Sequence, residues 1–177
     1  MIQSFIEGIT NLNSNTDSVR FTTDCIRGRS FNNWLCHNLG SANYDIVEGG
    51  LYEIDFNATI SSATAGVVAL QLVGNSGEPI PGTLMAETLA AAGDYANISI
   101  NKKIRVCCKG DANISVRSIA SVPTADDPTT PITTQTPIIL SANISISSNE
   151  QTSDGTQSGS EDTGDMLDQL TQDTENV

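Results

Sequence analysis

The strongest pattern in the chain is a strict alternation of apolar and polar residues over positions 51–60. Successive side chains of a β-strand point to opposite faces, so this alternation predicts a long strand with one buried face. The apolar parity consists of Tyr52, Ile54, Phe56, Ala58 and Ile60, and the polar parity of Glu53, Asp55, Asn57 and Thr59. A pair of glycines just before the stretch and a pair of serines just after it mark the ends of this strand.

Shorter apolar or alternating runs occupy most of the first 148 residues. Including the stretch above, the predicted strands cover residues 19–26, 31–36, 51–60, 67–73, 83–92, 97–107, 113–118 and 138–147. Residues 83–92 also fit a short helix because they are rich in alanine, and we assign them to a strand. The turn at 109–111 predicts that residues 95–119 form a β-hairpin. No segment has a convincing helical period, which excludes folds of alternating strands and helices. The pattern predicts an all-β antiparallel sandwich of about eight strands.

Two features interrupt this pattern. Lys102 breaks the apolar parity of residues 97–107, which indicates a bulge or an exposed stretch. Residues 123–137 form a loop rich in proline and threonine, whose four prolines exclude a central strand.

The charge is concentrated in the last 29 residues. The chain has 21 acidic and 8 basic residues, a net charge of -13. Residues 149–177 contain eight of the acidic residues and no basic one, so they carry -8 of that total. Their Gln, Ser, Thr, Gly, Asp and Glu cannot bury enough apolar area to offset the entropy of ordering, which predicts a disordered acidic tail. The net charge also argues against direct binding to nucleic acid or to an anionic membrane.

Catalytic and metal-binding signatures are absent from the sequence. The single histidine, His37, has no nucleophile motif beside it, so we interpret it as a hydrogen-bonded structural residue. The four cysteines lack the spacing of a metal site or a disulfide scaffold and are interpreted as small buried hydrophobes. Glu53 and Asp55 share one strand face, and we interpret them as solvated carboxylates rather than as cation ligands. We therefore expect no enzyme activity, no metal and no cofactor.

The hydrophobicity of the N-terminus does not indicate secretion or membrane insertion. The first 15 residues contain no basic region followed by a continuous apolar core, so they do not match a secretion signal. The chain contains no apolar run of 18 residues or more, and we expect no membrane partner.

Several segments resemble those of a known fold family. Residues 50–58, in which Gly-x-Tyr opens the long strand, resemble the central strand of tumour-necrosis-factor-like and complement-globular-head-like jelly rolls. Residues 68–83, an apolar strand followed by an Asn-Ser-Gly turn and Pro-Ile-Pro-Gly-Thr, resemble the C-terminal domains of spore-surface collagen-like proteins. Small phage and prophage proteins of Gram-positive gut bacteria resemble this chain over the same residues. They also contain strands that resemble residues 104–108, 113–118 and 142–146. The resemblance implies a jelly roll over residues 18–148 that associates as a homotrimer.

The same resemblance places apolar strand residues at the core or at the trimer axis, without deciding between the two positions. These residues are Tyr52, Ile54, Phe56, Ile98 and Ile100. A lean composition, 38% hydrophobic and 5% aromatic, agrees with a domain that completes its burial in a subunit interface.

Two functions are compatible with this fold. The first is a non-enzymatic virion structural protein of a bacteriophage, a trimeric capsid decoration or head-fibre protein, since no collagen-like stalk precedes the domain. In this hypothesis residues 1–17 anchor the protein to a capsid or other virion protein through Ile2, Phe5, Ile6 and Ile9.

The alternative is a receptor- or glycan-binding module on a phage tail tip or on a bacterial or spore surface. Its ligand loop would use Trp34, His37 and Tyr44, because aromatic rings stack on sugars. A tryptophan is nonetheless more often a core residue.

Overall fold

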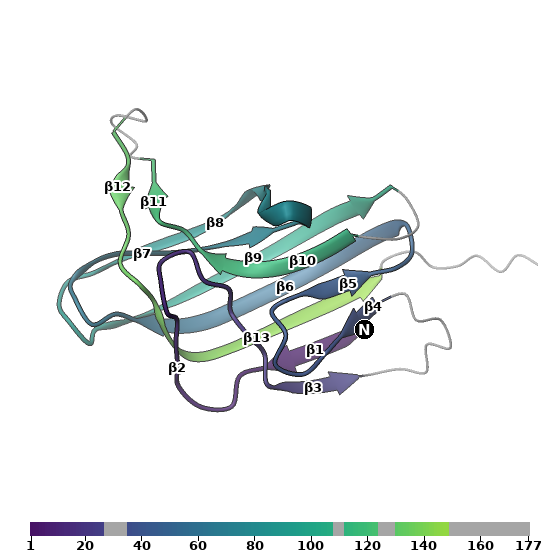
Figure 1. Ribbon diagram of the computed structural model, residues 1–177, viewed down its shortest axis with the longest axis horizontal. Coiled ribbons are helices and arrows are strands. Elements are labelled where there is room, and N and C mark those ends of the chain that lie inside the picture. Colours follow the sequence, from purple (N-terminus) through teal and green to yellow (C-terminus); the bar gives the residue numbers. More distant parts are fainter. Residues whose placement is uncertain (27–34, 108–111, 124–129, 149–177) are drawn as a thin grey trace, which may run out of the picture.

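Two antiparallel sheets form a sandwich in the computed structural model, which describes residues 1–26, 35–107, 112–123 and 130–148. The tail prediction for residues 149–177 lies outside these ranges. We call the six-stranded sheet "sheet one" and the five-stranded sheet "sheet two". The strand order is β3-β1-β13-β6-β9 in sheet one, where β2 also pairs with β13, and β4-β5-β10-β7-β8 in sheet two. The chain therefore confirms the predicted all-β jelly roll (Figure 1).

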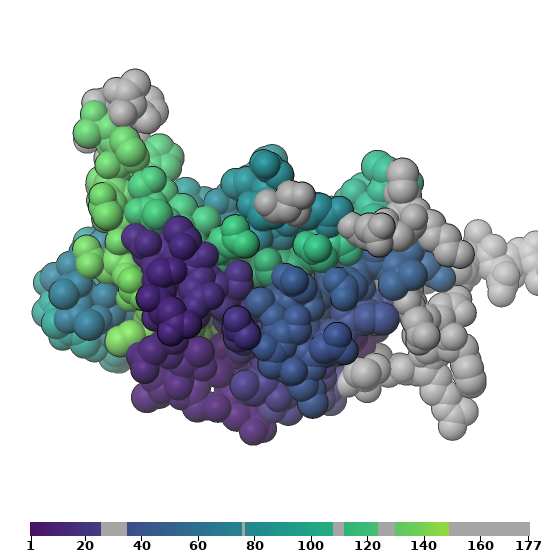
Figure 2. Space-filling model, viewed as in Figure 1, coloured from purple at the N-terminus to yellow at the C-terminus, as the bar shows by residue number. Residues whose placement is uncertain are grey.

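The strands of sheet one are β1 (Ile2–Phe5), β2 (Thr10–Asn11), β3 (Thr23–Ile26), β6 (Gly50–Ser61), β9 (Tyr95–Val106) and β13 (Ile138–Ser148). Those of sheet two are β4 (Leu35–His37), β5 (Tyr44–Ile46), β7 (Gly66–Val73), β8 (Pro79–Leu89) and β10 (Ala112–Ser118). A single turn of 3-10 helix, η1 (Asn75–Gly77), connects β7 to β8. A short ribbon of β11 (Ser121–Val122) and β12 (Ile132–Thr133) projects from one end of the molecule (Figure 1). Figure 2 shows N-terminal residues against the base of this ribbon, where the Asn15 side-chain amide donates to the Thr134 carbonyl oxygen at 3.3 Å.

The core lies between the two sheets and is built by the alternation seen in the sequence. Tyr52, Ile54 and Phe56 of β6 are buried, and Ile98 of the neighbouring β9 is buried beside them. Ile100 is partly buried and packs against the same cluster. Burial of one such side chain stabilises a fold by about 1.5–3 kcal/mol. Tyr52, Ile54, Phe56 and Ile98 therefore belong to the core of a single chain, whereas Ile100 lies at its margin.

The N-terminal strand is an integral part of the sandwich. In β1, Ile2 pairs with Ile146 of β13 on one side and with Ile26 of β3 on the other. Ile2 and Ile6 are both buried in the core. A boundary at residue 17 is therefore wrong, because residues 1–17 supply an inner strand to the domain that they were expected to precede.

The expected hairpin over residues 95–119 is also wrong. Strand β9 pairs with β6 in sheet one, whereas β10 pairs with β5 and β7 in sheet two. A period-two pattern fixes which face of each strand is buried but not which strand lies beside it, and here the connection crosses between the sheets. Lys102 causes no bulge either, since β9 keeps one register with β6 throughout and Lys102 pairs with Ile54.

The remaining strand predictions differ from the structure mainly at their ends. Residues 83–89 are strand rather than helix and belong to β8, which begins already at Pro79 and ends at Leu89, three residues before the predicted end. The short β5 is absent from the prediction because three residues are too few to show an alternation. Residues 31–34 lie outside the described chain, and β4 begins at Leu35.

Candidate functional site

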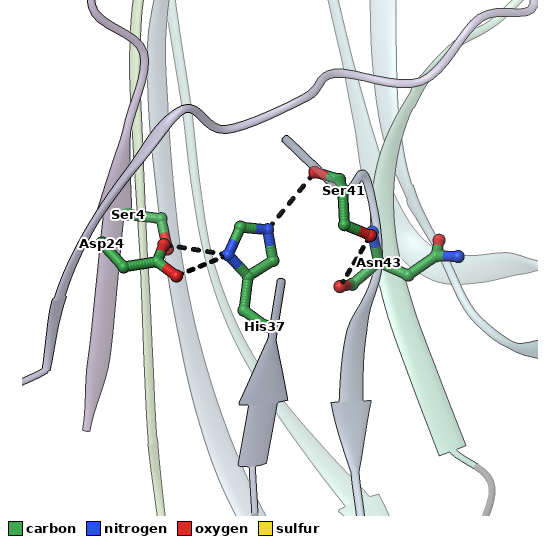
Figure 3. A network of polar contacts seen from close by, with 5 residues as sticks. All are labelled: Ser4, Asp24, His37, Ser41 and Asn43. Atoms are coloured by element: carbon green, nitrogen blue, oxygen red, sulfur yellow. Dashed lines mark hydrogen bonds and ion pairs between the residues drawn. The ribbon is translucent and has the colours of Figure 1, made fainter. Parts of the chain in front are cut away.

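A cluster of polar and aromatic side chains joins the two sheets at their edge. We call Ser4, Asp24, His37 and Tyr44 the inter-sheet clasp, since β1 and β3 of sheet one supply the first two and β4 and β5 of sheet two supply the others. The His37 Nδ1 atom lies 2.8 and 2.9 Å from the two Asp24 carboxylate oxygens (Figure 3). The Ser4 hydroxyl donates a hydrogen bond to Asp24. The His37 side chain is 0% exposed and Asp24 13%, so the pair is held away from water.

The other His37 ring nitrogen faces the protein backbone. Its Nε2 lies 3.3 Å from the Ser41 carbonyl oxygen (Figure 3). A local turn fixes this carbonyl, because the Asn43 backbone N–H donates to the Ser41 hydroxyl at 3.0 Å. The Phe21 backbone N–H also donates to the Ser41 carbonyl oxygen, at 3.4 Å. Both ring nitrogens of His37 therefore have an internal oxygen partner.

Aromatic rings enclose the clasp on its core side. The Tyr44 and His37 rings stack with their centroids 4.2 Å apart and an interplanar angle of 14°. Phe21 meets Tyr44 edge to face, with the ring centroids 5.8 Å apart. Burial raises the pKa of the Tyr44 phenol far above its ordinary value, the Ser4 hydroxyl opposes this rise, and the negative charge of Asp24 adds to it. Tyr44 is accordingly a neutral packing residue at any physiological pH.

The clasp is unsuited to general acid–base catalysis. The Ser4 hydroxyl donates to Asp24 rather than to His37, and the Nε2 atom that would accept a proton from a nucleophile faces a backbone carbonyl. The prediction of a hydrogen-bonded structural histidine is therefore confirmed. The predicted ligand loop is wrong for His37 and Tyr44, because their rings are buried and unavailable to a sugar. Trp34 lies outside the described residues.

A second polar assembly covers the outward face of sheet one. The polar parity of β6 continues in register onto β13, β1 and β9, so that short polar side chains form rows across the sheet. We call this surface the polar face. It consists of Gln3, Glu53, Asp55, Asn57, Thr59, Asn97, Ser99, Asn101, Lys103, Ser141, Asn143, Ser145 and Ser147.

Side chains of the polar face bind one another across the strands. Asn57 and Asn143 exchange two amide hydrogen bonds, of 2.9 and 2.8 Å. The Thr59 hydroxyl donates to the Asn97 side-chain oxygen at 2.8 Å. The Asn101 amide donates to Asp55 and, at 3.1 Å, to Glu53. The sequence shows the polar parity of each strand, but these pairs depend on which strands are neighbours.

Comparisons with known proteins show the fold of the chain. No family model and no curated protein sequence matches it. Among solved structures, the globular domain of a zebrafish complement 1qA protein has a TM-score of 0.55 and 13% sequence identity. That similarity covers 84% of this chain and 96% of the zebrafish domain. The fold is that of a C1q-like jelly roll. Two structures of murine APRIL, determined at pH 8.5 and 8.0, have TM-scores of 0.48 and 0.47, with 12% and 11% identity over 81% of this chain and 95% of theirs.

In the part of the jelly roll that the structure describes, no group of three or more His, Cys, Asp or Glu side chains is placed to hold a metal ion. The same ranges contain no helix long and apolar enough to cross a membrane.

The cysteines lie nearer the surface than expected. Cys36 and Cys107 are exposed and Cys25 is half-buried, and all three are free thiols. The expectation of small buried hydrophobes is therefore wrong for Cys36 and Cys107. Cys36 lies in the edge strand β4 and Cys107 just beyond the edge strand β9, so neither contributes to the core.

Of the four predicted anchoring residues, one is left well exposed. Ile2 and Ile6 belong to the core, and Phe5 is half-buried in β1. Ile9 has 68% of its surface exposed. A contact with another protein through this segment therefore has to use Ile9 rather than the apolar set as a whole.

Proposed function

We propose that this chain is a non-enzymatic structural protein of a bacteriophage virion, a homotrimeric capsid decoration or head-fibre protein. The observation that supports it is the polar face, a sheet surface on which several side chains already bind one another across the strands. The C1q-like fold supports a structural or binding module, and the sequence resemblance implies the threefold trimer and the phage setting.

The polar face supplies about half of a standard subunit interface. Its two longest strands have 12 residues each. At ~3.4 Å per residue and ~4.8 Å between strands, β9, β6 and β13 together span roughly 400 Å², against the ~800 Å² that each partner contributes to an interface of standard size. Strand β1 adds little to this area, because it is short.

The chemistry of the face also suits burial against a copy. An amide that loses water on association costs about 1–3 kcal/mol unless it keeps a hydrogen-bond partner. Asn57, Asn143 and Asn97 already have such partners within the chain, so their amides remain bonded when a neighbouring copy excludes water. Short Ser, Thr and Asn side chains also lose little conformational entropy when they are packed.

The trimer is tested by native mass spectrometry of the full chain. We expect a mass three times that of the chain, and dissociation in Asn143→Asp, which replaces a paired amide by a charge at the centre of the polar face. Thr88→Asp adds the same charge to an exposed position of β8 in the other sheet and serves as the matched control. A monomer for the unmodified chain, or equal behaviour of the two variants, contradicts the proposed interface.

The virion role is tested separately on purified particles. We expect the chain in virions at a copy number that is a multiple of three, and reduced occupancy for Ile9→Asp, which charges the exposed apolar residue of the N-terminal segment. Asn11→Asp places the same charge two residues away and is the control. Absence of the chain from particles contradicts the virion role, and full occupancy of the Ile9 variant contradicts the contact at Ile9.

A further inference from the structure

Positive charge is concentrated at one end of strand β9. All three lysines of the chain lie between positions 102 and 109, and residues 95–110 contain four basic residues and no acidic one. Lys102, Lys103 and Arg105 belong to β9, which is an edge strand of sheet one. Lys103 and Arg105 are exposed on the outward parity of β9, and Lys102 is half-buried on the opposite parity, with its amine beside Gly82 of β8. We call these three residues the basic edge.

The nearest carboxylates are engaged by other groups. Lys103 pairs across the strands with Glu53, and Asp55 is the next residue of the same parity. The Asn101 amide donates to both of these carboxylates. Within the described ranges, His37 and Asp24 are the only titratable side chains of opposite type in direct contact, so the basic edge forms no ion pair with an acidic residue there.

The acidic tail leaves the domain close to this edge. Ser148, the last residue of β13, pairs with Tyr52, and Tyr52 pairs with Ile104 between Lys103 and Arg105. Two strand spacings amount to about 10 Å. Figure 1 shows β9 and β13 ending at the same end of the molecule. Glu150 and Asp154 follow Ser148 by two and six residues, and extended chain spans ~3.3 Å per residue, so both carboxylates reach the basic edge.

We propose that the acidic segment 149–177 docks on the basic edge of its own chain. The charges are complementary, because the segment contains eight acidic residues and no basic one. Tethering at Ser148 keeps the segment at an effective concentration in the millimolar range, which compensates for weak individual ion pairs. Among the strands that the structure describes, β9 has β6 as its one neighbour, so its outer side is an edge of the kind that pairs readily with other chains. The docked segment thus shields the edge while it neutralises the lysines.

The test is zero-length carbodiimide cross-linking of the full chain, followed by peptide mass spectrometry. This reagent joins a lysine amine to a carboxylate only when the two are in contact. Chains of normal and heavy nitrogen isotope are mixed, so that links within one chain are distinguished from links between chains. We expect links from Lys102 and Lys103 to tail carboxylates within one chain, with a yield that falls several-fold between ~0.1 M and ~1 M salt as the screening length drops from ~10 Å to ~3 Å.

A pair of variants provides the control. Arg105→Gln removes one charge of the basic edge but leaves both reactive lysines, and we expect about a two- to fivefold lower yield. Arg20→Gln removes one exposed charge outside the edge and leaves the yield unchanged. The proposal is overturned if tail links are missing, occur only between chains, persist at high salt, or fall equally in both variants. Lys103 also belongs to the polar face, so the native mass is measured on the same sample: a trimer without tail links overturns this proposal alone, and a monomer with tail links overturns the trimer alone.

Discussion

The inter-sheet clasp and the polar face both consist of hydrogen-bonded polar side chains, but they differ in their access to water. In the clasp, Asp24 and His37 are nearly or fully buried, so a lost partner leaves a group that water cannot reach. In the polar face of a single chain, Asn57 and Asn143 bind each other at the surface, where water replaces a lost partner as long as no other copy covers the face. Loss of a hydrogen bond therefore costs much stability in the clasp and little in the polar face.

The largest effect is expected from breaking the clasp. His37→Ala removes a ring that stacks on Tyr44 and leaves the Asp24 carboxylate without its main partner. We expect the free energy of unfolding to fall by about 3 kcal/mol, measured by urea denaturation. Asn38→Ala, at an exposed neighbouring position, provides a baseline of less than about 0.5 kcal/mol. A loss below about 1 kcal/mol for the histidine variant contradicts a stabilising clasp.

A smaller effect is expected from the amide pair of the polar face. In a double-mutant cycle of Asn57→Ala and Asn143→Ala, the coupling free energy is expected to be about 0.5 kcal/mol. The cycle is measured by urea denaturation under conditions where the oligomeric state of all four proteins is the same. If the coupling free energy is as large as the loss caused by His37→Ala, the expected difference in energetic cost between the clasp and the polar face is contradicted.

The smallest effect is expected at an exposed carboxylate bound by backbone N–H groups. Asp17 accepts hydrogen bonds from the backbone N–H groups of Asn13 and Ser18, and these bonds lower its pKa below the ordinary value of 3.8. A lowered pKa in the folded state stabilises the fold above the unfolded value, and this contribution is lost as the pH falls through the folded value. Asp17→Asn should therefore flatten the decline of stability below about pH 4 by a few tenths of a kcal/mol. If stability declines equally below about pH 4 in the variant and in the unmodified chain, Asp17 is not a source of this pH dependence.

The sequence predicts those parts of the fold that depend on alternation within one strand. Strands β6, β7 and β13 lie close to their predicted positions, and Tyr52, Ile54 and Phe56 occupy the core. Alternation carries no information about neighbours, which is why β9 and β10 were assigned to one hairpin instead of two sheets. It also fails for β1, whose few apolar residues resemble a free amphiphilic segment until the pairing of Ile2 with Ile146 is known.

The candidate sites were less predictable for the same reason. The structural role of His37 follows from the absence of catalytic motifs, but its partner Asp24 lies on another strand in the opposite sheet. Tyr44 is buried because its ring stacks on His37 and meets Phe21 edge to face, a contact between separate segments that no local pattern indicates. The polar parity of β6 was visible, whereas its pairing with Asn143 and Asn97 required the order of the strands.

The position of β1 between β3 and β13 sets an order of events during synthesis. Strand β1 leaves the ribosome long before one of its two neighbours, since Ile2 pairs with Ile146 at the far end of the domain. At ~5–20 residues per second, the rest of the domain takes on the order of ten seconds to appear. Sheet one is therefore completed only after translation has passed β13. Until then the edge of β1 that pairs with β13 in the folded domain is unpaired. Nascent chains on neighbouring ribosomes of the same messenger RNA can compete with β13 for this edge.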